Sequence, residues 1–271
     1  MMRIGKVVLT FIQYLVWVFR GDIAKISGHV FNAQAEIHYV VYGEGEPVLL
    51  MHGGLSHKLT WFAQIPILVR KGFQVILMDT RGHGKSTHDV DTHDYELYAS
   101  DALKVLDALN ITKVDLIGWS DGGNTALTLA SKLAWTNSQR IRKIITISAN
   151  YHPTGLTSMA YSDNTKVSRG LILWGKKTWS KMGKHYQETE RHIKNLWQSA
   201  PNFTSDELAR IKNPTLIIVG EKDHITVAHS RSLANILPLG ELSVIQGAGH
   251  AAPLTHSANV NALILTFLLK K

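Results

Sequence analysis

From about residue 24 onward, short apolar runs alternate along the chain with stretches of helical pattern. The runs occupy residues 35–41, 47–51, 74–78, 114–118, 143–148, 215–219 and 241–245. The first alternates apolar and polar residues like a half-buried strand. The others are mostly apolar, as strands buried on both faces are. Helical patterns cover residues 95–109, 124–134 and 259–269. This alternation predicts an α/β fold with a mostly parallel, doubly wound sheet that has helices on both faces.

Residues 151–206 interrupt this rhythm between the fourth and fifth buried runs. They lack strong strand patterns and combine aromatic residues with a basic cluster. The aromatic residues include Tyr151, Tyr161, Trp174, Trp179, Tyr186 and Trp197, and the basic ones Lys166, Arg169, Lys176, Lys177, Lys181 and Lys184. Ligands of such sheets bind at the carboxyl ends of the strands. We therefore expect this segment to be an inserted helical lid over those ends, on a core formed by residues 24–150 and 207–271.

Residues 1–23 form a separate apolar segment. Arg3 and Lys6 precede the almost wholly apolar stretch Val7 to Phe19. Its thirteen residues are too few for an ordinary transmembrane helix, which needs about 20. Three interpretations stay open: an uncleaved membrane-associating helix, a signal peptide, or an extra helix packed on the domain. Because no small-x-small cleavage pattern follows, we expect a cytoplasmic or membrane-associated protein rather than an exported one.

Composition narrows the chemistry. The 271 residues are 45% hydrophobic and 18% charged, as in a globular protein, and contain no cysteine. A disulfide scaffold, thiolate metal sites and a cysteine nucleophile are therefore excluded. The net charge of +8 suits an anionic membrane surface, an anionic substrate or simply a well-solvated surface. We find no motif for nucleic-acid binding and expect no nucleic-acid partner.

A nucleophile motif follows the run at 114–118. The phrase Gly118-Trp119-Ser120-Asp121-Gly122 matches G-x-S-x-G and leads into a helical pattern. This is the strand–turn–helix setting that a nucleophile elbow requires. The serine would project above the sheet at a helix N-terminus, whose dipole favours developing negative charge. We predict that Ser120 is the nucleophile of an acyl transfer.

Acyl transfer also needs backbone N–H groups directed at the oxyanion. The run at 47–51 ends in His52-Gly53-Gly54. We expect the oxyanion hole to be formed by the N–H groups of Asp121 and Gly54, with Leu55 as the alternative to Gly54. His52 itself is interpreted as a structural residue of this loop.

The serine needs a base, and the base needs an orienting carboxylate. In this architecture the chain order is nucleophile, acid, histidine. Asp223 follows the run at 215–219 within GEKDH, and His250 follows the run at 241–245 within GAGHAAP. His224, His229 and His256 are less well placed after a strand, and Asn150, which follows the fourth buried run, is an amide and not an acid. We predict that Ser120, Asp223 and His250 form a catalytic triad.

These phrases together resemble the α/β-hydrolase superfamily over nearly the whole chain after residue 24. HGG, DTRGHGKS, GWSDGG, GEKDH and GAGHAAP occur in that family's order. DTRGHGKS lacks the spacing of a phosphate-binding loop and is interpreted as scaffolding near the site. The resemblance implies no cofactor and no metal. A serine at the elbow argues against epoxide hydrolases and haloalkane dehalogenases, which use aspartate there.

Within the superfamily, GWSDGG with DTRGHGKS is most similar to the valacyclovir-hydrolase (biphenyl-hydrolase-like) group. That resemblance implies that Asp121 helps to bind a substrate ammonium. The mixed aromatic and basic lid instead suits an apolar or anionic ligand. We expect Trp119, Leu55 and, in the lid, Trp174 to line the substrate site with Asp121.

The function expected from these residues is hydrolysis of a small to medium carboxylic ester, thioester or lactone through an acyl-enzyme. Two alternatives use the same triad: carbon–carbon bond hydrolysis and cofactor-free perhydrolysis. A third is a ligand-binding receptor with a residual triad. A fourth is a protein whose main task is docking to a membrane surface through residues 1–20. The sequence does not define the oligomeric state.

Overall fold

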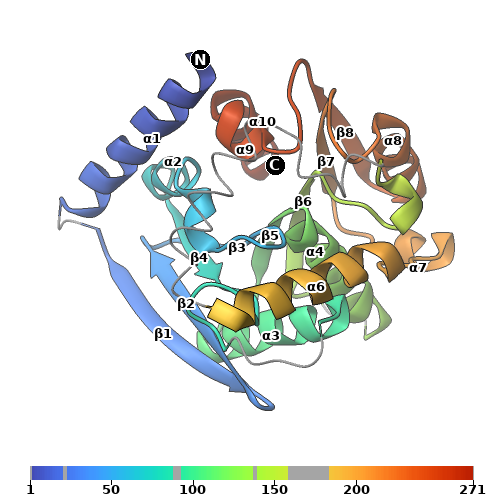
Figure 1. Cartoon of the computed structure of the whole chain (residues 1–271), viewed down its shortest axis with the longest axis horizontal. Coiled ribbons are helices and arrows are strands. Elements are labelled where there is room, and N and C mark those ends of the chain that lie inside the picture. Colours follow the sequence, from blue (N-terminus) through green and yellow to red (C-terminus); the bar gives the residue numbers. More distant parts are fainter. Residues whose placement is uncertain (1, 21–22, 88–92, 137–138, 158–182, 271) are drawn as a thin grey trace.

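A single eight-stranded sheet forms the centre of the computed structural model, which describes residues 2–20, 23–87, 93–136, 139–157 and 183–270 (Figure 1). The strands are β1 (Lys25–Asn32), β2 (Ala35–Tyr42), β3 (Glu46–Met51), β4 (Phe73–Met78), β5 (Val114–Trp119), β6 (Ile141–Ile147), β7 (Thr215–Gly220) and β8 (Gly240–Ile245). Their order across the sheet is β1-β2-β4-β3-β5-β6-β7-β8. All seven strands expected from the apolar runs are present.

The sheet is parallel except at one edge. From β4 through β3 to β8 every neighbouring pair is parallel, whereas β2 runs antiparallel to both β4 and β1. The pattern analysis did not predict β1. Its residues are mostly exposed, so they lack the apolar run that marks a buried strand, and only pairing with β2 reveals it.

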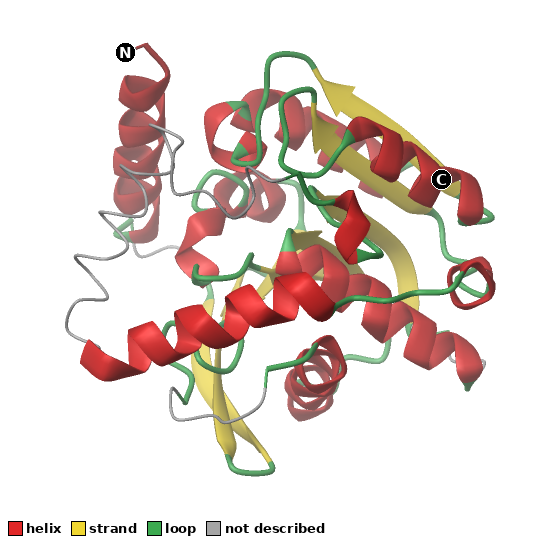
Figure 2. Cartoon of the chain, turned by 45° about the vertical axis from the view of Figure 1, so that its right-hand side comes forward, coloured by secondary structure: helices red, strands yellow, loops and turns green. Residues whose placement is uncertain are grey.

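Helices cover both faces of the sheet, which confirms the doubly wound prediction (Figures 1 and 2). One face carries α1 (Met2–Val18), α2 (Ile65–Arg70), α9 (Ala252–Thr255) and α10 (Ser257–Leu269), and the other carries α3 (Tyr95–Ala108), α4 (Asp121–Trp135) and α8 (Val227–Ile236). Alternate residues of the strands supply the two cores: Val48 and Leu50 of β3 point to one, and Leu49 and Met51 to the other. Two short 3₁₀ helices, η1 (Lys58–Trp61) and η2 (Pro153–Gly155), lie in loops.

The chain between β6 and β7 has two α-helices, with loops around them, where the structure describes it. It contains α6 (Gly183–Ser199) and α7 (Ser205–Ala209). Ile193 and Leu196 of α6 form a small third core with Tyr95 and Tyr98 of α3, so the insertion is packed on the domain at this point. The expected lid residues Trp174 and Trp179, and the basic residues at 166, 169, 176, 177 and 181, lie outside the described residues.

The apolar N-terminal segment is a helix whose inner face packs on the domain. Tyr14 is only 4% exposed, and its hydroxyl lies 3.2 Å from that of Tyr42 in β2. Phe11 meets Phe62 edge to face. The structure packs this helix on the domain through its inner face, and large apolar side chains on its other side are exposed. None of the described helices is long and apolar enough to cross a membrane.

Candidate active site

The three residues predicted as a triad come together at the carboxyl ends of β5, β7 and β8. His250 Nε2 lies 3.0 Å from Ser120 Oγ, and His250 Nδ1 lies 2.7 Å from Asp223 Oδ1. Both distances are those of hydrogen bonds. The arrangement allows His250 to accept the serine proton at Nε2 while Asp223 holds the proton at Nδ1.

Ser120 occupies the turn between β5 and α4. Its φ of 54° and ψ of −120° are strained for a residue with a side chain, and they direct the backbone sharply from strand to helix. The turn tolerates no bulk beside it, since a Cβ on Gly122 would overlap the carbonyl group of Met51 in β3. The G-x-S-x-G pattern is therefore required by close backbone approach as well as by the strain at the serine.

Asp223 is held by more than His250. Its Oδ2 accepts a 2.5 Å hydrogen bond from the hydroxyl of Ser148 and a longer one from Gly220 N, and its Oδ1 accepts one from Ile225 N. Ser148 is 1% exposed, with a φ of 55°. The carboxylate is thus fixed from several sides. Sequence reasoning missed Ser148, although it directly follows β6, at the same sheet edge as the triad.

Electrostatics favour an ionised acid and a basic histidine. Burial opposes charge on Asp223, but the charge and hydrogen bond of His250, with the bond from Ser148, hold the pKa of Asp223 below its usual value. Burial likewise opposes charge on His250, but the Asp223 carboxylate outweighs it, and Asp121 adds to the effect. The pKa of His250 is therefore raised above 6.5.

In the loop after β3, the backbone N–H of Gly54 is the better candidate for the oxyanion hole. Leu55, the alternative, donates its N–H to His83 Nε2 at 3.1 Å. A Cβ on Gly53 would lie 3.2 Å from that of Ser120, so the loop runs directly beside the nucleophile. His52 bridges two loops: its Nδ1 lies 2.7 Å from Gly53 O, and its Nε2 accepts the N–H of Thr80 at 3.0 Å. Burial lowers the pKa of His52 to about 3, so it is neutral and structural.

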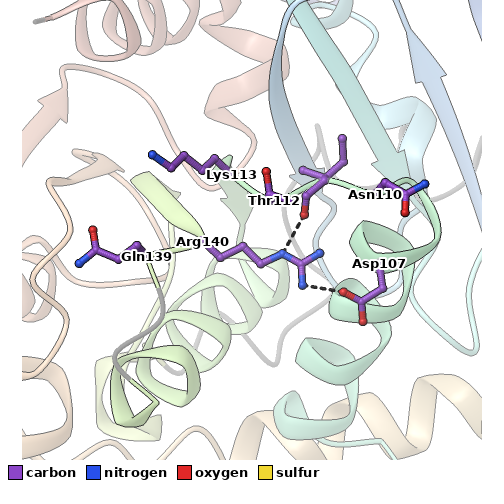
Figure 3. A pocket seen from close by; sticks show the side chains of 7 residues that line it. Asp107, Asn110, Thr112, Lys113, Gln139 and Arg140 are labelled. Atoms are coloured by element: carbon purple, nitrogen blue, oxygen red, sulfur yellow. Dashed lines mark hydrogen bonds and ion pairs between the residues drawn. The ribbon is translucent and has the colours of Figure 1, made fainter.

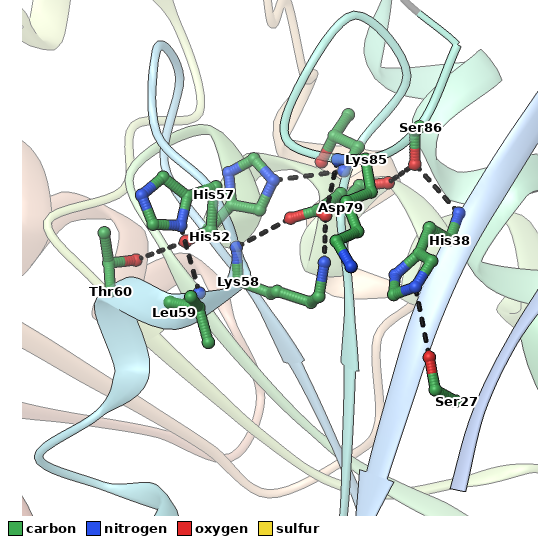
Figure 4. Close-up of polar contacts among 11 residues, drawn as sticks. Ser27, His38, His52, His57, Lys58, Leu59, Thr60, Asp79, Lys85 and Ser86 are labelled. Atoms are coloured by element: carbon green, nitrogen blue, oxygen red, sulfur yellow. Dashed lines mark hydrogen bonds and ion pairs between the residues drawn. The ribbon is translucent and has the colours of Figure 1, made fainter. Parts of the chain in front are cut away.

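Buried ion pairs hold the loop of the phrase DTRGHGKS. Figure 4 shows Asp79 accepting hydrogen bonds from Lys58 and from the backbone N–H of Lys85. Arg81 forms a bidentate ion pair with Asp101 of α3. These side chains are almost fully buried, and they serve one another rather than a ligand. The scaffolding interpretation of this phrase agrees with these contacts.

Asp121 lies in a buried polar cluster formed by three helices. Its Oδ1 accepts hydrogen bonds from Tyr95 of α3 at 3.0 Å and from the indole N–H of Trp197 of α6 at 2.9 Å, and that indole also lies 3.0 Å from Oδ2. Burial raises the pKa of Asp121, against these hydrogen bonds and the charge of His250. The carboxylate also fills the space beside Gly54, where any Cβ would overlap it. Tyr95 and Trp197 were not predicted as site residues, because nothing in their own segments indicates that they meet Asp121.

The other expected substrate contacts lie as follows. Trp119 is 8% exposed, and its indole donates to the carbonyl oxygen of His250 at 2.9 Å, with Trp61 edge to face beside it. Those contacts fix the histidine loop. Leu55 is partly buried against the third core, beside α3 and α6. Trp174 lies outside the described residues.

A hollow that lies apart from this site has a different character. It lies at the amino ends of β5 and β6, opposite the triad, and is lined by Asp107, Asn110, Ile111, Thr112, Lys113, Gln139 and Arg140 (Figure 3). Arg140 donates to Ile111 O and to Asp107 there, so the guanidinium and the carboxylate that line this hollow already pair with each other. The described part of the chain also contains no group of three or more His, Asp or Glu residues placed to hold a metal.

Comparison with known proteins identifies relatives across the whole fold. The family model described as "alpha/beta hydrolase fold" matches residues 46–165. "Serine hydrolase BPHL" of Mus musculus is 31% identical over 259 residues, covering 90% of this chain and 87% of that protein. "Bifunctional esterase/perhydrolase DCH" of Acinetobacter calcoaceticus is 26% identical, covering 86% and 96%. The solved structure of a bromoperoxidase from Bacillus anthracis superimposes with a TM-score of 0.74 at 24% identity, covering 91% and 100%.

Proposed function

The chain belongs to the α/β-hydrolase family, and we propose that it is a serine hydrolase that cleaves a small to medium carboxylic ester, thioester or lactone through an acyl-enzyme. The observation that carries this proposal is the continuous Asp223–His250–Ser120 hydrogen-bond chain, with links of 2.7 and 3.0 Å. A receptor with a residual triad would have no need to keep that geometry or to fix Asp223 with four donors.

In the proposed reaction, Ser120 Oγ attacks the acyl carbonyl while His250 Nε2 takes its proton. The N–H groups of Gly54 and Asp121 stabilise the oxyanion. The tetrahedral intermediate then collapses, and His250 passes the proton to the leaving oxygen or sulfur. Water, deprotonated by His250, attacks the acyl-enzyme, and the acid is released as Ser120 regains its proton. Asp223 stays ionised throughout and stabilises the transient imidazolium.

The test is hydrolysis of p-nitrophenyl esters from acetate to octanoate by the wild type and by Ser120→Ala. Removing the nucleophile of a working triad lowers turnover on the order of 10⁶-fold. Ser205→Ala, an exposed serine at the start of α7, is the matched control and keeps full turnover. Equal rates in wild type and Ser120→Ala, or no hydrolysis by either, would overturn the esterase proposal.

Perhydrolysis is the second candidate, favoured by the relative named as an esterase and perhydrolase. In that reaction hydrogen peroxide replaces water as the attacking group, so the acyl-enzyme yields a peracid and free Ser120. Peracid formation that competes with hydrolysis and depends on Ser120 would distinguish it. Carbon–carbon hydrolysis would instead appear as cleavage of a vinylogous diketone without ester turnover.

A narrower version of the main proposal is that the substrate is an ester with a positively charged acyl group. The negative charge of Asp121 beside Ser120 supports it. The hydrogen bonds that Asp121 already accepts from Tyr95 and Trp197 oppose it, since they leave the carboxylate less available. Preference for an aminoacyl ester over its uncharged analogue, lost in Asp121→Asn, would favour the narrower version.

A further inference from the structure

The outer face of α1 is the most apolar exposed surface in the described part of the chain. Six of the twelve large apolar side chains that are exposed there belong to this helix and the residue after it: Val8, Leu9, Ile12, Leu15, Val16 and Phe19. Phe19 is 82% exposed. Contiguous apolar surface of this kind is characteristic of an interaction site rather than of a solvated helix.

The exposed side of the helix has an apolar arc with basic residues along one border. At 3.6 residues per turn, the six apolar side chains fall within an arc of roughly 120° that is free of charge. Lys6, Gln13 and Arg20 are seven residues apart, so they line one edge of this arc, and Lys6 and Arg20 are exposed. Residues 1–20 contain three basic residues and no acidic one.

The helix is also fixed in place and short. Its inner side is held by Tyr14, Phe11 and Trp17 against Tyr42 and Phe62, so its apolar outer side faces away from the domain. Seventeen residues span about 25 Å of helix, less than the roughly 30 Å of a bilayer core. A helix with these properties can lie along a membrane surface with its apolar side in the boundary between headgroups and acyl chains.

We propose that the outer face of α1 docks on an anionic phospholipid bilayer, with Ile12 and Val16 in the apolar boundary and Lys6 and Arg20 against the headgroups. Charge selects this occupant over a second copy of the chain. In an antiparallel pair of these helices Lys6 would face the partner's Arg20, with no acidic residue of the segment to neutralise them. Anionic headgroups supply the missing charge. This proposal does not depend on the reaction at Ser120.

The experiment is flotation of the full-length protein with vesicles of phosphatidylcholine alone or mixed with phosphatidylglycerol. We expect the wild type to float with the mixed vesicles and to be released by salt. The double variant Ile12→Glu/Val16→Glu should lose binding to the mixed vesicles, and to vesicles of phosphatidylcholine alone if the wild type binds those as well. Lys6→Ser/Arg20→Ser should lose affinity only for the mixed vesicles, by about fivefold per cation removed.

Leu239→Glu is the matched control, because Leu239 is exposed to a similar extent at 53% but lies before β8. It should bind as the wild type does. An unchanged circular dichroism spectrum shows that each variant is folded, independently of any hydrolase activity. A wild type that binds neither vesicle, or an Ile12→Glu/Val16→Glu variant that binds normally, overturns the proposal. Vesicle-independent dimers in the wild type that this variant dissociates would assign the face to a second copy instead.

Discussion

At the scale of residues, the site contains two carboxylates whose environments shift their pKa values in opposite directions. Asp223 is held ionised by His250 and Ser148, whereas Asp121 is buried among neutral donors and has a raised pKa. Both raise the pKa of His250. The base of the proposed reaction must be neutral to accept the serine proton, so these charges set the acid limb of the pH profile.

Replacing Asp121 by Asn tests this coupling. A negative charge beside His250 stabilises its protonated form, and removing that charge lowers the pKa of His250. We expect the acid limb of kcat/KM for a neutral ester to move to lower pH, so that activity survives further into acid. The backbone N–H at this position stays in place.

Asp206→Asn serves as the control, because Asp206 is exposed on α7 and should leave the profile unmoved. An acid limb that stays in place in Asp121→Asn, or moves to higher pH, would show that Asp121 does not contribute to the pKa of His250.

At the scale of elements, α6 is joined to the catalytic core by a polar contact to Asp121 and by a small apolar cluster with α3. The indole N–H of Trp197 reaches both oxygens of Asp121, and Leu196 and Ile193 pack beside it on α3. The insertion therefore meets the proposed oxyanion residue directly. The position of α6 and the environment of Asp121 depend on the same side chain.

The variant Trp197→Phe keeps an aromatic ring but removes the donor. Asp121 Oδ1 would keep its hydrogen bond from Tyr95, but Oδ2 would lose the one from the indole. An unsatisfied buried acceptor costs about 1–3 kcal/mol, and we expect a loss of that size in the free energy of unfolding measured in urea. We also expect faster tryptic cleavage after Arg191, which is exposed on α6, because the helix detaches more often.

Trp135→Phe is the comparison, since Trp135 is 63% exposed at the end of α4. Equal stability and equal cleavage rates in the two variants would contradict a fastening role for the Trp197 N–H.

At the scale of the whole molecule, two apolar cores sandwich the sheet, and buried ion pairs hold the loops at its carboxyl edge. Lys58 after β3 and Asp79 after β4 come from neighbouring strands, and the Asp79 side chain is 0% exposed. Such a pair contributes little by itself relative to a well-packed apolar pair. Breaking it is costly because one charge stays buried.

We therefore expect Lys58→Met to lower the free energy of unfolding by about 3–5 kcal/mol. Lys132→Met removes an exposed partner of Glu96, with side chains 47% and 67% exposed, and should cost less than about 1 kcal/mol. Urea unfolding of both variants gives the comparison. Similar losses would mean that the Asp79 carboxylate finds water or another donor once Lys58 is gone.

The sequence alone determined the buried strands and the positions of the candidate catalytic residues, because both depend on local patterns. Apolar runs are required wherever a strand is buried on both faces, and Ser120, Asp223 and His250 each lie within five residues after such a run. Parallel strands share one carboxyl edge, so motifs at strand ends must face the same side of the sheet. The fold and the three candidate catalytic residues were predictable for that reason.

The tertiary structure decided what depends on lateral neighbours. Ser148 reaches Asp223 because β6 and β7 are adjacent in the sheet. The sequence of a single strand does not specify which strands lie beside it. Tyr95 and Trp197 meet Asp121 only when α3, α4 and α6 converge. The edge strand β1 is defined by its partner β2, and the packed face of α1 by Tyr42 and Phe62. These contacts join residues far apart in sequence, and no local pattern specifies them.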